Sequence, residues 1–156
     1  MRLTCVPAAC LAAGFSLFGL APAAPAQEAN REVVVVKTDL GDIVRNLSRK
    51  TGEFKDSFNK AVEHAMMDGP KVEERARHRG DDLHASAKKL EDVYHDKKDK
   101  NNPAVREQVD KTLAAASEVN AVMRDHRFTD LLQREWESLR SDCNALAAVY
   151  ELSPIR

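Results

Sequence analysis

Apolar residues recur at alternating steps of four and three along four stretches of this chain, and short polar breaks separate the stretches. Such spacing keeps the apolar side chains on one face of a helix, and that face needs partner helices to cover it. In the first stretch the face consists of Leu40, Val44, Leu47, Thr51, Phe54, Phe58, Ala61 and Ala65. The pattern therefore predicts an all-α fold, an antiparallel up-down-up-down four-helix bundle over residues 38–153.

Prolines and capping residues indicate where the helices begin and end. Gly69 suits the end of one helix and Pro70 the first turn of the next, and Pro103 is placed in the same way. Short connections favour antiparallel neighbours, although a long two- or three-helix coiled coil that self-associates is an alternative. The side chains that can cap the helices are Thr38, Asp39, Asn102 and Thr129. The expected helices span about 38–66, 70–97, 103–125 and 129–152.

The first 26 residues are typical of a secretory signal peptide. Arg2 gives a basic start, an apolar run follows, and Ala24-Pro25-Ala26 is an A-x-A cleavage site. Cleavage before Gln27 leaves a single-domain length that begins with a tail, residues 27–37. Within the tail, Val33–Val36 fits a strand, a backward extension of the first helix or disorder. We therefore expect an exported bacterial protein, periplasmic or secreted, with no membrane span in the mature chain; a retained anchor is the alternative.

Charge and motifs argue against several functions. With Arg2 removed, 23 basic residues face 25 acidic ones, so the chain is not attracted electrostatically to nucleic acid. The mature chain keeps one cysteine, Cys143, at an apolar helix position that favours a buried thiol over a catalytic one. Nucleophile elbows, phosphate-binding loops, H-E-x-x-H and haem-attachment motifs are missing. The sequence predicts a non-enzymatic protein with no catalytic residue and no cofactor.

Methionine and histidine residues gather at one end of the expected bundle, where the first helix meets the second and the third meets the fourth. Thioether and imidazole groups suit a soft metal such as Cu(I), but methionines also fill irregular gaps between helices. The candidate metal ligands are His64, Met66, Met67, His78, Met123 and His126. Two carboxylate–histidine pairs, Asp81–His84 and Asp92–His95, lie about 16 Å apart on one helix and are interpreted as surface ion pairs, not a di-iron site.

Trp136 and Arg140 are one helical turn apart, as are Arg140 and Asn144. We therefore expect the guanidinium to stack on the indole and to bond the asparagine, either as a structural anchor or as a contact for a partner protein. The start of the second helix, residues 75–80, offers little to a dry core. It is expected to be loosely packed and is the other candidate interaction surface.

The segment W-x-x-L-R-x-D-x-N-x-L-A-x-x-Y, from Trp136 to Tyr150, resembles the closing helix of small exported bacterial helical-bundle proteins of unknown function. The resemblance implies a secreted bundle and no particular activity, and Cys143 stands where a larger aliphatic residue is expected. The expected function is a structural or protein-interaction module that binds an unknown protein or itself. A periplasmic metal-handling bundle is the alternative, and a membrane-associated amphipathic bundle is a third hypothesis.

Overall fold

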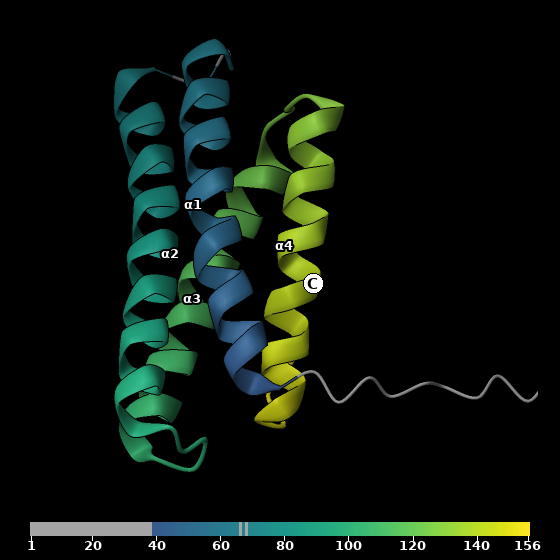
Figure 1. The fold of residues 1–156 in the computed structure, drawn as a ribbon. Coiled ribbons are helices and arrows are strands. Elements are labelled where there is room, and N and C mark those ends of the chain that lie inside the picture. The colour runs from purple at the N-terminus through teal and green to yellow at the C-terminus, as the bar shows by residue number, and fades with distance from the viewer. Residues whose placement is uncertain (1–38, 66, 68) are drawn as a thin grey trace, which may run out of the picture. The chain divides into compact units, whose positions relative to one another are not determined.

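The computed structural model describes residues 39–65, 67 and 69–156, which form four α-helices packed against one another (Figure 1). The predicted all-α class is confirmed, since this part of the chain contains no strand. None of its helices is long and apolar enough to cross a membrane. The predicted signal peptide, the tail and Val33–Val36 lie outside the described residues. The helices are α1 (Leu40–His64), α2 (Pro70–Lys97), α3 (Pro103–Asp125) and α4 (Asp130–Val149).

Side-chain caps begin three of the helices. Asp39 accepts a hydrogen bond from the backbone N–H of Gly41 at 3.3 Å, and Asn102 accepts one from Ala104 at 3.0 Å. Thr129 caps α4 through the N–H of Leu132 at 3.3 Å. The limits of α2 and α3 coincide with the predicted ranges. Both α1 and α4 are shorter than predicted at each end, and the largest difference is at the C-terminal end of α4.

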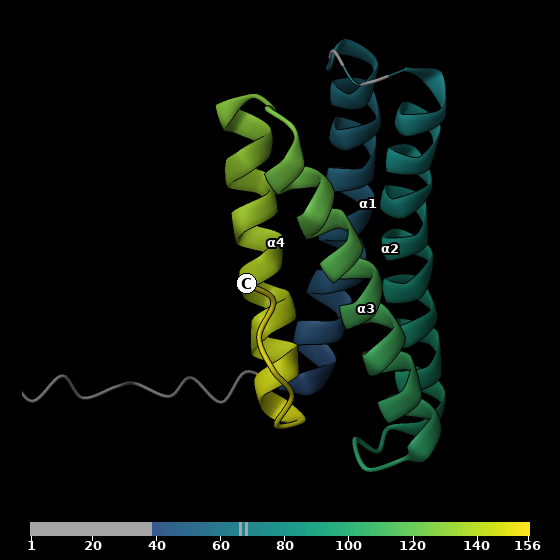
Figure 2. The same ribbon diagram turned by 180° about the vertical axis from the view of Figure 1, so that it is seen from behind.

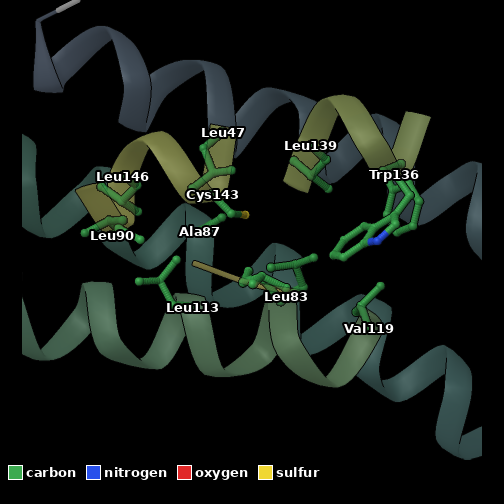
Figure 3. Packing of buried hydrophobic residues seen from close by; sticks show 14 of the residues in the cluster. Leu47, Leu83, Ala87, Leu90, Leu113, Val119, Trp136, Leu139, Cys143 and Leu146 are labelled. Carbon is green, nitrogen blue, oxygen red and sulfur yellow. The ribbon is translucent and has the colours of Figure 1, made fainter. Parts of the chain in front are cut away.

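The helices form a ring of neighbours. α1 packs on α2 and on α4, and α3 completes the ring by packing on the same two helices. The connections α1–α2 and α3–α4 lie at one end, and α2–α3 lies at the other (Figure 1). α3 runs obliquely, beside α2 at one end and beside α4 at the other (Figure 2). Leucines, valines and Trp136 from all four helices fill the centre (Figure 3).

Glycines bring α1 and α2 close together. Each of three glycines faces a ring of the opposite helix: Gly41 with Tyr94, Gly52 with His84, and Gly80 with Phe58. A Cβ atom on Gly80 would lie 2.9 Å from Phe58 Cδ1, closer than real Cβ contacts come. The start of α2 therefore packs closely on α1 at Gly80, where the missing side chain makes room for Phe58. Towards α3 it is more open, because a hollow of about 200 Å³ is lined there by Val72, Ala76 and Arg79. The expected loose packing is thus wrong only for the side that faces α1.

A row of aromatic rings connects this packed region to α4. The ring centroids of Phe54 and Phe58 are 5.3 Å apart, those of Phe54 and Trp136 are 5.4 Å apart, and Phe58 lies 5.6 Å from Phe128. Such spacings are those of favourable aromatic pairs. The rings join the core beneath α4 to the connection between α3 and α4.

Candidate functional site

Trp136 is a core residue. Its side chain is 2% exposed, and the indole Nε1–H donates a hydrogen bond to Oδ1 of Asn120 on α3 at 3.1 Å. Asn120 is itself buried, so the bond satisfies two polar groups that are both removed from water. Of the two expected roles, the structure supports the anchor, because the indole is not on the surface of the folded chain.

The predicted arrangement of Trp136, Arg140 and Asn144 is wrong. Asn144 does not turn to the residue one turn away; its Oδ1 accepts the N–H of Ile155 at 2.7 Å, and its Nδ2 donates to the Ile155 carbonyl at 3.4 Å. Arg140 is half-buried on α4. A partner that is distant in sequence therefore takes the Asn144 amide that the local pattern assigned to Arg140.

The candidate metal ligands lie in different environments. Met67 and Met123 belong to the apolar core, whereas His64 and His78 are exposed. His126 is half-buried and lines a hollow of about 200 Å³ between α2 and α3. Met66 lies outside the described residues. Within the described ranges, no group of three or more His, Cys, Asp or Glu side chains is placed to hold a metal ion.

Asp81 and His84, one of the two expected carboxylate–histidine pairs, each contact a residue of α1 instead. Asp81 lies 3.8 Å from Lys55 Nζ on α1, and His84 Nδ1 lies 3.3 Å from Thr51 Oγ1. Thr51 donates its own hydroxyl hydrogen to the Ser48 carbonyl at 2.8 Å, which leaves its oxygen to accept from the imidazole. These contacts join α1 to α2 and correct the interpretation of Asp81 and His84 as an ion pair.

Cys143 has the environment of an unreactive thiol. Burial, with a smaller effect of the neighbouring Asp142 carboxylate, raises its pKa to about 12. Because the thiolate is the nucleophilic form, this cysteine stays protonated and unreactive at neutral pH. The side chain lies among core leucines (Figure 3).

A groove of about 340 Å³ runs between α1 and α4. Phe54 and Leu139, both buried, are the apolar part of its lining, and Leu131 stands beside them with 60% of its surface exposed. The groove is lined by Lys50, Glu53, Phe54, Leu131, Arg134, Glu135, Ser138 and Leu139. Apolar residues and charges of both signs therefore occur together.

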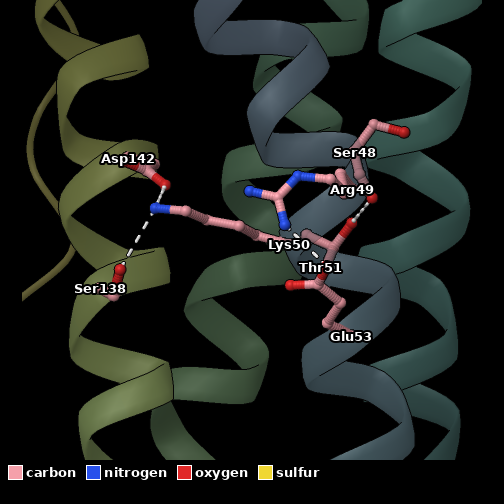
Figure 4. Close-up of polar contacts among 7 residues, drawn as sticks. All are labelled: Ser48, Arg49, Lys50, Thr51, Glu53, Ser138 and Asp142. Carbon is pink, nitrogen blue, oxygen red and sulfur yellow. Dashed lines mark hydrogen bonds and ion pairs between the residues drawn. The ribbon is translucent and has the colours of Figure 1, made fainter.

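Polar contacts fix the charged rim of this groove. The Lys50 side chain crosses from α1 to α4, where its Nζ lies 2.5 Å from Asp142 Oδ2 and 3.2 Å from Ser138 Oγ (Figure 4). Within α1, Arg49 pairs with Glu53, which also lines the groove, at 2.7 Å. One carboxylate oxygen of Glu135 is buried without a hydrogen-bond partner, which leaves an acceptor free.

One feature of the sequence indicates the exposed leucine beside this groove. Leu131 and Leu132 are adjacent, and successive helix residues point about 100° apart, so both cannot face the core equally. The structure buries Leu132 to 2% exposure and leaves Leu131 outside. The lining of the groove, in contrast, depends on how α1 and α4 are paired.

Comparison with known proteins gives no match: no family model, no curated protein and no solved structure is significantly similar to the chain.

Proposed function

We propose that this chain is an exported, non-enzymatic protein-interaction module, built as an antiparallel up-down-up-down four-helix bundle. The groove between α1 and α4 binds an amphipathic segment of a partner protein. The observation that supports this proposal is the exposed Leu131 beside the apolar lining of that groove. The resemblance of the closing helix to exported helical bundles agrees with the same assignment.

Leu131 has the environment of a contact residue. A leucine moved from water into an interface contributes about 2 kcal/mol, and Leu131 gains none of this where it is exposed. Around it, Arg134 and Lys50 are basic, and Glu53 and Glu135 are acidic. A partner helix that presents an apolar side chain between charged neighbours fits such a groove, with the apolar contact giving affinity and the charges giving orientation.

A photo-crosslinking amino acid at position 131 tests the proposal. The matched control carries it at Lys111, which is exposed on α3 and does not line the groove. In exporting cells we expect one protein to crosslink at 131 and not at 111. The purified pair should bind in calorimetry, and Leu131→Asp should weaken that binding at least tenfold. Equal crosslinking at both positions, or binding unchanged by Leu131→Asp, would rule out the groove.

Export is a separate part of the proposal. Mass spectrometry of the chain recovered outside the cytoplasm should find Gln27 as its first residue. Replacing Ala24 and Ala26 with leucine should block processing, because the cleavage site requires small residues. Recovery of the uncleaved chain from the cytoplasm alone would contradict this part and leave the groove to be tested separately.

Metal handling remains the alternative function. Met67 and Met123 both belong to the core, so a Cu(I) site there would use thioethers inside the bundle together with His126. A metal that binds only the folded state raises the unfolding midpoint by mass action. Melting the mature chain with Cu(I), and then with Met67→Leu and His126→Ala variants, decides this alternative.

A further inference from the structure

The α4 side of the groove between α1 and α4 carries one exposed apolar residue and two charges of opposite sign. Leu131 lies three residues before Arg134 and four before Glu135, so the three side chains are neighbours on one face of the helix. All three line the groove. The described residues expose two large apolar side chains, and Leu131, at 60%, is the more exposed. An uncovered leucine and two adjacent opposite charges therefore occur together on α4.

The other two charges of the groove are paired within the chain. Lys50 is bound by two residues of α4, and Glu53 pairs with Arg49 (Figure 4). Among the ion pairs of the described residues, none includes Arg134 or Glu135. One oxygen of the Glu135 carboxylate also has no hydrogen-bond donor. A guanidinium and a carboxylate that are both unpaired and adjacent are electrostatically complementary to a copy of themselves.

A twofold axis through this face brings the two charges into register with those of a second copy. When two α4 helices pack antiparallel about an axis between residues 134 and 135, Arg134 of each copy lies beside Glu135 of the other. The same arrangement places Leu131 opposite Ser138 of the second copy, because both residues lie equally far from the axis. Ser138 lines the groove together with buried Phe54. Each exposed leucine therefore meets the groove of the other copy.

We propose that the groove between α1 and α4 binds a second copy of this chain through an antiparallel, twofold-symmetric α4–α4 contact. The inference rests on the proposed function, because it names the occupant of the same groove: the amphipathic segment is the α4 helix of the second copy. Each copy contributes the apolar anchor, the base and the acid, so every pairing occurs twice. The contact involves little more than one helix face of each copy, and we expect a reversible dimer.

Charge reversal at the two positions tests the symmetry directly. Arg134→Glu places carboxylates opposite each other at both pairings, and Glu135→Arg places guanidinium groups there. We expect each variant alone to dimerise about tenfold more weakly than the unchanged chain. Mixing the two variants restores opposite charges at both pairings, so the mixture should form a heterodimer about as strongly as the unchanged chain dimerises. Sedimentation of the chain as cells produce it, over a series of concentrations, measures all of these.

Two further variants complete the test. Glu137→Arg is the matched control, because Glu137 is exposed on α4 and does not line the groove, and this variant should dimerise like the unchanged chain. Leu131→Asp should weaken the dimer at least tenfold, since it removes the apolar anchor. Circular dichroism first establishes that each variant is folded, and Leu131→Asp decides the test if a charge reversal unfolds the chain.

A chain that sediments as a monomer at every concentration up to about 1 mM would overturn the inference. A mixture of the two reversed variants that associates no more strongly than either variant alone would also overturn it. The photo-crosslinking experiment separates this failure from failure of the proposed function. A monomeric chain that crosslinks a different protein at position 131 loses the second copy and keeps the interaction groove, whereas a monomeric chain that crosslinks nothing there loses both.

Discussion

The pair α1–α2 and the pair α3–α4 are held together in different ways. In the first pair, glycine on one helix faces a ring on the other, so the backbones approach closely, and polar contacts such as Thr51–His84 lie at the edge of this fit. In the second pair, direct helix contact is smaller, and the helices are joined by buried Asn120, by Asn144 and by residues 152–156, which run back along α4 (Figure 2). Close steric fit makes the first pair intolerant of added volume. The second pair depends on hydrogen bonds to the returning segment.

The largest loss of stability should come from changing Trp136, which packs on Phe54 of α1 and bonds Asn120 of α3. Trp136→Ala should lower the free energy of unfolding by about 4 kcal/mol, because it leaves a cavity beside Phe54 and an unpaired Asn120 oxygen. Trp136→Phe is the control, since it keeps ring packing and loses only the hydrogen bond, and it should lose less than half as much. Chemical denaturation measures both variants, and equal losses would mean that the ring contact contributes little.

Adding volume should affect the α1–α2 pair next. Gly80→Val places methyl groups against Phe58 and should destabilise the fold by about 2 kcal/mol. Gly52→Ala is the matched change: its Cβ meets the edge of the half-buried His84 at 3.2 Å, and helix propensity gains up to about 1 kcal/mol. We expect it to be nearly neutral in thermal melting. A neutral Gly80→Val would show that the helices separate easily.

Relieving the left-handed backbone of Glu151 should stabilise the turn that leads from α4 into residues 152–156. Glu151→Gly removes the left-handed penalty and should raise the free energy of unfolding by about 1 kcal/mol. Glu151→Ala keeps the penalty and should leave stability unchanged. Equal melting of the two variants would mean that the turn carries no strain.

The smallest predicted effect concerns pH. The pKa of the Cys143 thiol is raised from 9.0 to about 12 in the folded chain. Above pH 9 the unfolded chain therefore loses a proton that the folded chain keeps, so stability falls as the pH rises from 9 towards 12. Relative to Cys143→Ala, the unchanged chain should lose less than about 1 kcal/mol between pH 8 and 9.5. Parallel curves for the two proteins would show that the thiol does not contribute.

Local patterns predicted the helices well, and they failed where distant residues compete. Proline and capping residues place α2 and α3 at their observed limits, because these signals act within one turn. Gly52 has a lower helix propensity than alanine, but its position is explained by the ring of His84 on α2, which lies against it. Asn144 was assigned to Arg140 because they are one turn apart, but its partner is Ile155, which no helical periodicity connects to it. The groove between α1 and α4 cannot be predicted before the helices are paired.

Trp136 is the only tryptophan in the chain, and Asn120 connects it directly to the carbonyl of Arg156. The hydrogen-bond network of the indole thus extends through Asn120 to the segment that runs back along α4. Fluorescence emission of the unlabelled protein should therefore respond to variants that disturb the packing of residues 152–156. The single tryptophan thus makes the packing of the C-terminal residues measurable without an added label.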